Sequence, residues 1–175
     1  MADPRDWFEG LYCRKLAYAS NTQYMAAMTQ IDTINALRLM QSADELRARL
    51  SGAFAAVHGL SVNEYFLLKQ LNHAPGNRLP RVELAKRMHV SASTITRMVA
   101  PMEKIGLVDR ETGARDARLA LVVLTKAGAG KLKDAEATFA MHAGYIFEDR
   151  WTQSEREQFS ELLNRLVAGT PASLT

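Results

Sequence analysis

Residues 91–125 constrain the fold of this chain more than any other stretch, because they predict a capped helix followed at once by a hairpin. Ser91 supplies a side-chain acceptor for the free amides of a first helical turn. Apolar residues then recur at steps of three and four, which gives the helix one apolar face. Gly106 suits the left-handed residue that ends a helix, and Leu107 is then expected to fold back on Met102. The apolar face consists of Ile95, Met98, Val99, Met102 and Ile105.

The residues after Gly106 predict a β-hairpin with a charged tip. Residues 108–111 and 118–124 are expected to form two strands around a loop, residues 112–117, which contains glycine and charged side chains. The side chains left facing water are short hydroxyls and arginines, which reach base edges and phosphates in DNA complexes. We therefore interpret this stretch as a winged helix-turn-helix that binds duplex DNA. The water-facing side chains are Ser93, Thr94, Thr96 and Arg97 on the helix, and Arg115, Asp116 and Arg118 near the hairpin tip.

A shorter helix is predicted just before Ser91. Pro80 suits its first turn, where the missing amide of proline costs nothing, and His89 and Val90 leave only a tight link between the helices. Two short helices joined this closely are typical of a helix-turn-helix. Leu79 is expected to pair briefly with the hairpin as a third strand. The residues of the short helix that are expected to point inward are Val82, Leu84, Ala85 and Met88.

Long amphipathic helices flank this centre. A seam of apolar residues from Ala36 to Val57 steps by three and four, and such a seam requires a partner helix. Ser42-x-x-Glu45 resembles a capping box that starts a new helix, but the unbroken spacing favours one long helix that ends at Gly59. The seam consists of Ala36, Leu39, Ala43, Leu46, Leu50, Ala53 and Val57.

Three further helices begin at capping residues. The helix after Ser61 is expected to reach about residue 73, the helix after Thr125 about residue 150, and a last helix opens at Thr152. Ser61 and Thr152 each precede a glutamate at the third position, Glu64 and Glu155, which completes a capping box. The rows expected inside are Tyr65, Leu68 and Leu71 in the first of these helices, and Phe159, Leu162, Leu163 and Leu166 in the last.

Helices of this length cannot bury all of their apolar rows around so small a centre, so we expect a symmetric homodimer in which the outer helices interlock. The predicted fold class is mainly α with a small β-hairpin wing, a winged helix-turn-helix on a helical dimerisation scaffold. An N-terminal helical extension is expected over residues 1–30. Residues 31–60 and 125–175 are assigned to the dimerisation region, and residues 61–124 to the DNA-binding domain.

The charge distribution supports a polyanion as partner. The formal net charge of the 175 residues is only +3, but residues 78–118 hold nine Lys and Arg against five Asp and Glu. A basic centre flanked by near-neutral helices is typical of a nucleic-acid-binding module on a scaffold. The alternative is that these charged residues form an ordinary solvated surface. The charge distribution alone does not decide between the two interpretations.

The expected location and chemistry follow from what the sequence lacks. The acidic start carries no signal-peptide pattern, no apolar run is long enough for a bilayer, and Cys13 has no second cysteine to pair with. We therefore expect a cytoplasmic protein without a membrane partner. No Gly-rich phosphate loop, nucleophile elbow or acid–base cluster occurs, so we expect no enzymatic activity, catalytic residue or cofactor. The four histidines lack paired metal-ligand spacing, which argues against a metal site.

Three motifs resemble those of the MarR (multiple antibiotic resistance regulator) family of transcription factors, within a similarity that covers about residues 36–166. The wing and its junction read Asp116-x-Arg118-x-x-x-Val122-x-Leu124-Thr125-x-x-Gly128. The helix-turn-helix reads Leu84-Ala85 followed by Val90-Ser91-x-Ser93-Thr94-x-Thr96-Arg97. The entry to the wing reads Glu103-Lys104-x-Gly106-Leu107-Val108. Agreement over all three motifs is too extensive for chance.

This resemblance implies that the two helices beginning at Ser91 enter successive major grooves of a near-palindromic site, with half-site centres about 10 bp apart. The wings would lie in the flanking minor grooves, where Arg118 would insert and favour A·T-rich flanks. Asp116 would orient an arginine by a charge-assisted hydrogen bond. Arg97 would bind either guanine or phosphate, and its position in the sequence does not decide between them.

The remaining predicted contacts come from hydroxyls and basic residues around the same helix. Ser93 and Thr94 are the best candidates for base edges or backbone, with Thr96 beside them, whereas Ser91 is better suited to capping than to DNA contact. For each of these side chains the alternative is a solvated surface group or a local cap. The expected phosphate contacts are Lys86, Arg87 and Arg115.

The resemblance also implies an effector. Many members of this family bind small aromatic or phenolic ligands between the dimerisation helices and the winged domain, and repression is their commoner mode. Here that crevice would be lined by Phe54, His58, Tyr65 and Phe66, since aromatic residues with a few polar tips suit such a ligand. The alternative is that these aromatic residues form ordinary core. For the whole protein, the alternative function is a winged-helix adaptor that binds proteins and not DNA.

Overall fold

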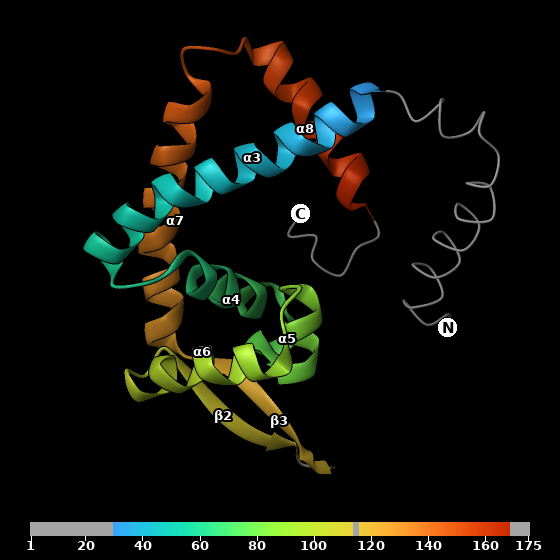
Figure 1. Ribbon diagram of the computed structural model, residues 1–175. Helices are drawn as coiled ribbons and strands as arrows, with labels where there is room; N and C mark the ends of the chain where they lie inside the picture. Colours follow the sequence, from blue (N-terminus) through green and yellow to red (C-terminus); the bar gives the residue numbers. More distant parts are fainter. Residues whose placement is uncertain (1–29, 114–115, 169–175) are drawn as a thin grey trace, which may run out of the picture. The chain divides into compact units, whose positions relative to one another are not determined.

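The computed structural model describes residues 30–113 and 116–168, and it is mainly helical with one small sheet (Figure 1). The predicted fold class is therefore confirmed. The chain divides into two units, Met1–Leu46 and Arg47–Thr175, and the first long helix runs across the boundary. The elements in chain order are α3 (Gln30–Ala53), η1 (Phe54–His58), α4 (Val62–His73), η2 (Pro75–Asn77), β1 (Arg78–Pro80), α5 (Arg81–Arg87), α6 (Ala92–Lys104), β2 (Val108–Gly113), β3 (Asp116–Leu124), α7 (Lys126–Phe147) and α8 (Gln153–Val167).

Residues 1–29 of the predicted N-terminal extension, with Cys13, lie outside the described residues. None of the helices that the structure describes combines the length and the apolar character needed to cross a bilayer. Within the same residues, no group of three or more His, Cys, Asp or Glu side chains is arranged to hold a metal ion.

Helix α3 is continuous, and it passes into the π-helical turn η1, which ends at Gly59 with φ 61°. The prediction of one long helix ending at Gly59 is therefore confirmed, and no new helix starts at Ser42. Helix α3 spans Gln30–Ala53 and therefore holds the predicted apolar seam from Ala36 to Ala53. The left-handed conformation at its end is one that glycine adopts without strain, which explains why the helix stops there.

Helix α4 is the centre of the core of the second unit. Ser61 Oγ accepts the amide of Glu64 at 3.2 Å, and the Glu64 carboxylate accepts the amide of Ser61 at 2.7 Å, which confirms the capping box. The predicted inward row is also confirmed, because Tyr65, Leu68 and Leu71 are each at most 1 % exposed. The helix contacts α7, β3 and α5, so the winged domain is built around it.

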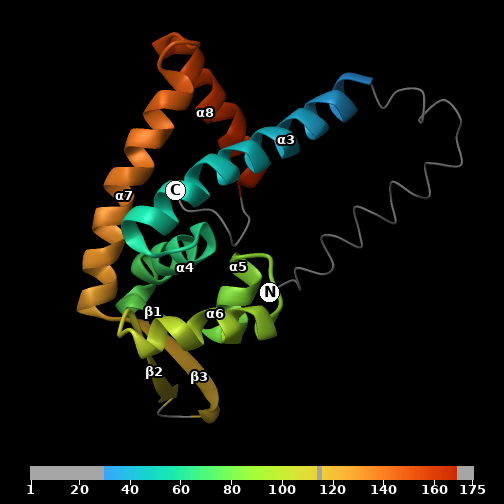
Figure 2. The same cartoon turned by 60° about the vertical axis from the view of Figure 1, so that its left-hand side comes forward.

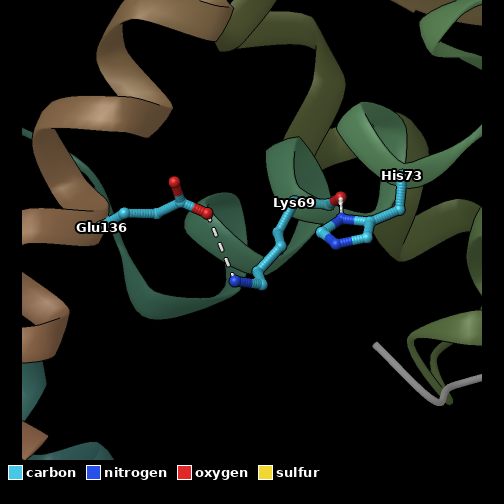
Figure 3. A network of polar contacts seen from close by, with 3 residues as sticks. All are labelled: Lys69, His73 and Glu136. Carbon is cyan, nitrogen blue, oxygen red and sulfur yellow. Dashed lines mark hydrogen bonds and ion pairs between the residues drawn. The ribbon is translucent and has the colours of Figure 1, made fainter. Parts of the chain in front are cut away.

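An ion pair links α4 to α7 beside this core, with the two charged side chains pointing toward each other (Figure 3). Lys69 Nζ lies 3.2 Å from Glu136 Oε1, and His73 Nδ1 lies 2.8 Å from the carbonyl oxygen of Lys69. Lys69 Nζ also lies 6.0 Å from the centroid of the Tyr65 ring. Burial raises the pKa of Tyr65 above its ordinary value, an effect that the charge of Lys69 opposes. Because both members of the ion pair keep partial contact with water, they orient the helices more than they stabilise them.

The strands form one antiparallel sheet in the order β1-β3-β2. Leu79 pairs with Val122, which confirms the predicted third strand. The predicted loop over residues 112–117 is wrong, because β2 continues to Gly113 and β3 begins at Asp116. The residues at the tip do not alternate between apolar and polar, so the sequence pattern did not predict this extension of the strands. Threonine suits a strand, and glycine tolerates the register shift that the sheet shows after Thr112.

Helix α5 departs from the prediction at its start. Pro80 is its N-cap, at the end of β1, rather than a residue of its first turn. Leu84 and Ala85 are buried as predicted, but Val82 is 59 % exposed, which corrects the expectation that it points inward. A helix of 7 residues has only about two turns, so few of its positions can face the core at once.

Helix α6 ends as predicted but buries only three of the five residues expected on its apolar face, since Met98 is half-buried and Ile105 is exposed. Gly106 has φ 75°, and the Leu107 amide donates to the Met102 carbonyl at 2.9 Å, which is the expected fold-back at a helix end. Ile105 was expected on the apolar face and is instead 66 % exposed, because the helix stops at Lys104 and the chain turns away. The buried residues of this face are Ile95, Val99 and Met102.

Helices α7 and α8 follow the wing and turn back on each other (Figure 2). The Thr152 amide donates to Glu155 Oε2 at 2.8 Å and Thr152 Oγ1 accepts the Glu155 amide at 3.3 Å, so this capping box is confirmed. The prediction that Leu162 and Leu166 lie inside is wrong for the single chain, since they are 55 % and 65 % exposed. Helix α8 has no buried residue. Of its apolar row, Phe159 packs against the rings of Phe147 and Trp151, with centroids 6.3 Å and 5.1 Å away, and stays half-buried. Helix α7 stops at Phe147, before the predicted residue 150.

Candidate nucleic-acid interface

The turn between α5 and α6 fixes how the second helix is presented. His89 lies in the left-handed region at φ 53°. This conformation costs a residue other than glycine about 1–2 kcal/mol. The His89 amide donates to the Lys86 carbonyl at 3.2 Å, and the Val90 amide donates to the Ala85 carbonyl at 3.0 Å. These bonds satisfy the end of α5 and leave a tight link, which is the geometry of a helix-turn-helix (Figure 2).

Hydroxyl groups gather on the first turns of α6. Ser91 Oγ accepts the Thr94 amide at 3.1 Å, so Ser91 caps the helix as predicted. The same oxygen lies 2.8 Å from Ser93 Oγ and 2.8 Å from Thr94 Oγ1. Thr96 Oγ1 donates to the Ala92 carbonyl at 3.0 Å. These groups lie on an exposed or half-exposed surface, where hydroxyl oxygens can bind phosphates and base edges.

The basic residues around α6 divide into a paired and an unpaired set. Arg97 and Lys86 are exposed and have no ion pair within the described part of the chain. Their charges are therefore directed to solvent, or to a polyanion. The paired set is Arg78 with Glu111, Arg87 with Glu83, and Arg110 with Glu103, all at 2.8–2.9 Å.

The wing begins directly after α6. Asp116 and Arg118 belong to the first part of β3, next to the hairpin tip, and Arg115 lies outside the described residues. The DNA contacts expected of these three residues remain predictions.

A junction at the start of α7 holds the wing against the end of α6. Thr125 Oγ1 accepts the Gly128 amide at 3.0 Å and donates to the Gly106 carbonyl at 2.7 Å. The Thr125 amide donates to the Leu107 carbonyl at 3.2 Å. A Cβ atom on Gly128 would meet the Leu107 carbonyl oxygen at 2.0 Å, so a larger residue does not fit. The cap at Thr125 was predicted from the sequence and is confirmed, whereas the close approach that excludes a side chain at Gly128 was not predicted.

Arg81 lies on the same surface and was not among the predicted contacts. Its Nη1 lies 3.4 Å from Thr96 Oγ1, so the side chain crosses from α5 to α6. The sequence shows that this residue is basic but not where its charge points. The angle between the two helices decides which residue of α5 reaches α6, and that angle is a property of the folded structure.

Comparisons with known proteins agree with this geometry. The sequence model described as the MarR family matches residues 60–119, which hold α4, α5, α6 and most of the hairpin. The uncharacterized HTH-type transcriptional regulator YxaD of Bacillus subtilis (strain 168) is 32% identical over 108 residues, 61% of this chain and 73% of YxaD. The chain belongs to the MarR family.

Two further comparisons cover more of the chain. The HTH-type transcriptional repressor YetL of Bacillus subtilis (strain 168) is 26% identical over 152 residues, 85% of this chain and 90% of YetL. The crystal structure of Sco3205, a MarR family transcriptional regulator from Streptomyces coelicolor, in complex with DNA, is similar with a TM-score of 0.69. That similarity covers 81% of this chain and 89% of Sco3205, at 25% identity. As a member of the MarR family, the chain is a DNA-binding transcriptional regulator and not an enzyme.

In this MarR-family chain, the four residues expected to line an effector crevice come together. The ring centroids of Phe54 and Tyr65 are 5.0 Å apart, those of Phe54 and His58 are 5.8 Å apart, and those of Tyr65 and Phe66 are 5.5 Å apart. His58 Nε2 lies 2.7 Å from Thr138 Oγ1 on α7. Phe54, His58 and Tyr65 are buried and only Phe66 is half-exposed, so the four form a packed cluster with one open end.

A cavity of about 190 Å³ lies at this open end, next to the turn that presents α6. The Arg47 guanidinium lies 5.8 Å from the centroid of the Phe66 ring, and Arg47 Nη1 donates to Asn63 Oδ1 at 3.1 Å. His89, the left-handed residue of the turn, forms part of the wall. The cavity is therefore lined by one aromatic residue, two arginines and a residue of the helix-turn-helix link. Its lining consists of Arg47, Asn63, Phe66, Gln70, Arg87, Met88 and His89.

Proposed function

We propose that this MarR-family regulator is a homodimeric repressor that reads a near-palindromic DNA site with α6 and the wing of each protomer. The observation that carries the proposal is the surface at the N-terminal end of α6. There the hydroxyls of Ser93, Thr94 and Thr96 lie on the same helix as Arg97, whose charge is unpaired within the described residues, and follow directly on α5 with Lys86. Short hydroxyls and unpaired cations in this combination bind phosphates and base edges.

The roles within this surface follow from exposure and pairing. Arg97 enters the major groove and binds guanine or phosphate, while Lys86 contacts a phosphate. Arg87 keeps its ion pair with Glu83 and still has guanidinium donors for a second phosphate. Ser91 acts mainly as the helix cap. The wing contributes Arg115 and Arg118, with Asp116 as the orienting carboxylate.

Two protomers are required because the outer helices carry apolar side chains that their own chain leaves uncovered. Leu162 and Leu166 on α8, and Met141 and Tyr145 on α7, are all more than half exposed. An apolar surface of this kind is typical of a protein interface. We therefore assign residues 31–60 and 125–175 to dimerisation and residues 61–124 to DNA binding. A symmetric dimer would present its two α6 helices to half-sites about 10 bp apart.

Repression and release complete the proposal. YetL, which is named a repressor, is 26% identical over 85% of this chain. We assign the release signal to a small aromatic ligand with an anionic group, because the cavity offers Phe66 to a ring and Arg47 and Arg87 to an anion. A ligand in contact with His89 would act on the turn that orients α6. Phe54, His58 and Tyr65 pack behind Phe66 and would hold that wall in place.

The first experiment isolates genomic fragments that the purified protein retains and measures their binding by fluorescence anisotropy over a series of salt concentrations. A dimer that neutralises about 8 phosphates should give a log–log slope of about −7. A winged-helix adaptor for proteins would retain no fragment, even in dilute buffer. That result would overturn the DNA-reading surface proposed for α6.

The second experiment titrates small aromatic carboxylates, beginning with benzoate and salicylate, into the complex of protein and DNA. The proposal expects release of the DNA by at least one such compound. Arg47→Gln should abolish the release and leave DNA binding intact, since Arg47 belongs to α3 and lies on the cavity wall. Release that Arg47→Gln does not affect would show that the ligand binds elsewhere.

A further inference from the structure

One arginine on the surface of the winged domain belongs neither to the paired cations nor to the predicted DNA contacts. Arg81 is the first residue of α5 and follows Pro80, which ends β1 and caps the helix. Its Nη1 lies 3.4 Å from Thr96 Oγ1, so the guanidinium rests against the second turn of α6. Within the described residues, no carboxylate forms an ion pair with it.

The Thr96 hydroxyl gives this guanidinium a defined orientation. Thr96 Oγ1 donates its hydrogen to the Ala92 carbonyl at 3.0 Å, which leaves the oxygen as an acceptor for Arg81. The contact between Arg81 and Thr96 is long for a hydrogen bond, so it orients the side chain without neutralising it. A guanidinium carries several N–H donors, and this contact uses one of them. The half-buried Arg81 side chain therefore offers its other donors beside the exposed residues Thr96 and Arg97.

Two neighbouring arginines, unlike Arg81, form ion pairs with carboxylates of the protein. Arg78 lies three residues earlier in the chain, and its Nη1 is 2.8 Å from Glu111 Oε2 on β2. Arg110 Nε is 2.8 Å from Glu103 Oε2 on α6. Each of these charges is balanced within the protein. The charge of Arg81 has no such partner among the described residues, and it is held against the helix that reads DNA.

The way in which a helix-turn-helix docks on DNA indicates what the Arg81 side chain would contact. When the second helix lies in the major groove, the first helix crosses the DNA backbone at the edge of that groove. The side chain of Arg81 runs from the first turn of α5 to α6, so it would lie at that edge. We propose that Arg81 is a phosphate contact that Thr96 pre-orients, so that both helices bind one edge of the groove. This inference rests on the proposed function in one respect, which is that α6 enters a major groove.

The test compares Arg81→Gln with Arg78→Gln, which removes the same charge from an arginine that is already paired. Binding is measured by fluorescence anisotropy over a series of salt concentrations, on a duplex that the wild-type protein selects from a randomised pool and on an unrelated duplex. Arg81→Gln should weaken binding to both duplexes by about tenfold. It should also reduce the magnitude of the salt slope by about 1.8, because the proposed dimer loses one phosphate contact in each protomer. Arg78→Gln should change neither quantity, and thermal unfolding of both variants checks that they are folded.

Two further variants separate charge from orientation. Arg81→Lys keeps the charge and should keep the wild-type salt slope, while its affinity falls less than that of Arg81→Gln. Thr96→Val removes the acceptor with little change of shape. Because Thr96 acts partly through Arg81, the double variant Arg81→Gln with Thr96→Val should lose less affinity than the two single losses combined.

Two results would overturn the inference. In the first, Arg81→Gln has the affinity and the salt slope of Arg78→Gln. In the second, Arg81→Gln weakens only the selected duplex and leaves the slope unchanged, which would make Arg81 a base contact. Failure of the proposed function is distinguishable from both, because the wild-type protein itself would then fail to select a duplex.

Discussion

The winged domain and the outer helix α8 differ in how far a single chain completes them. In the winged domain, α4 and α6 are capped by serine side chains and bury whole rows of apolar residues. Helix α8 is capped just as well by Thr152 and Glu155, and yet it has no buried residue. Caps and apolar periodicity determine where a helix forms, whereas burial requires a second surface. The difference indicates that the winged domain buries its apolar rows within one chain, while α8 leaves a face exposed that the proposed dimer would cover.

The largest effect should come from charging the uncovered face of α8. Leu162→Asp combined with Leu166→Asp should abolish the proposed dimer, because burial of each leucine is worth about 1.5–3 kcal/mol and a buried carboxylate costs more. Sedimentation velocity should then show a monomer, and DNA affinity should fall with it. Asn164→Asp, on an exposed position of the same helix, is the matched control and should remain dimeric. A double variant that sediments like the wild type would contradict the assignment of this face.

The next largest effect should come from Gly128→Ala at the junction between the wing and α7. The new Cβ would meet the Leu107 carbonyl oxygen at 2.0 Å, and a backbone atom cannot move away cheaply. We expect the free energy of unfolding to fall by about 3 kcal/mol, measured by urea denaturation.

Gly130→Ala is the control for this variant, since a Cβ there meets nothing within 4 Å. It should stabilise α7 by up to about 1 kcal/mol, because alanine is a better helix former than glycine. Equal effects of the two substitutions would show that the junction is not tightly packed.

A smaller effect is expected from Arg118→Ala in the wing. Loss of a minor-groove arginine should weaken binding by about 1–3 kcal/mol and leave the oligomeric state unchanged. Arg110→Ala is the control in the same hairpin, because Arg110 is paired with Glu103. DNA affinity can be measured by anisotropy and size by sedimentation. If both variants bind DNA like the wild type, the wing contact at Arg118 is wrong.

The smallest effect should come from the cap of α8. The Thr152 backbone amide, and after it the Thr152 side chain, donate hydrogen bonds that lower the pKa of Glu155 below its ordinary value of 4.5. A lowered folded-state pKa contributes stability above the ordinary value, and that stability is lost as the pH falls through the lowered value. Circular dichroism of Glu155→Gln should therefore show a shallower loss of helix below pH 4.5 than the wild type. Glu161→Gln, outside the cap, should retain the wild-type profile.

The features that could be predicted from the sequence are those that depend on nearby residues. The caps at Ser61 and Thr152 and the helix end at Gly106 each involve groups within about four residues, so their patterns were sufficient. Exposure was harder to predict. Val82 and Leu162 both follow apolar spacing, but whether they are covered depends on which other surfaces are present.

The candidate site shows the same division between features that depend on nearby residues and features that depend on the folded structure. The hydroxyls of α6 could be assigned to its surface because the helical period alone determines their face. Arg81 could not be assigned, since its contact with Thr96 depends on the angle between two helices. The role of Gly128 was hidden for a similar reason, because the carbonyl that excludes a side chain belongs to Leu107, at the start of the wing.

The most direct test of a dimer with two DNA-reading heads is the spacing of the half-sites. Binding should be measured on the selected duplex and on the same duplex with about 5 bp, half a helical turn, inserted between the half-sites. The insertion turns one half-site to the opposite face of the DNA, so affinity should fall to that of a single half-site. Unchanged affinity after the insertion would contradict a dimer that holds its two α6 helices at the pitch of the double helix.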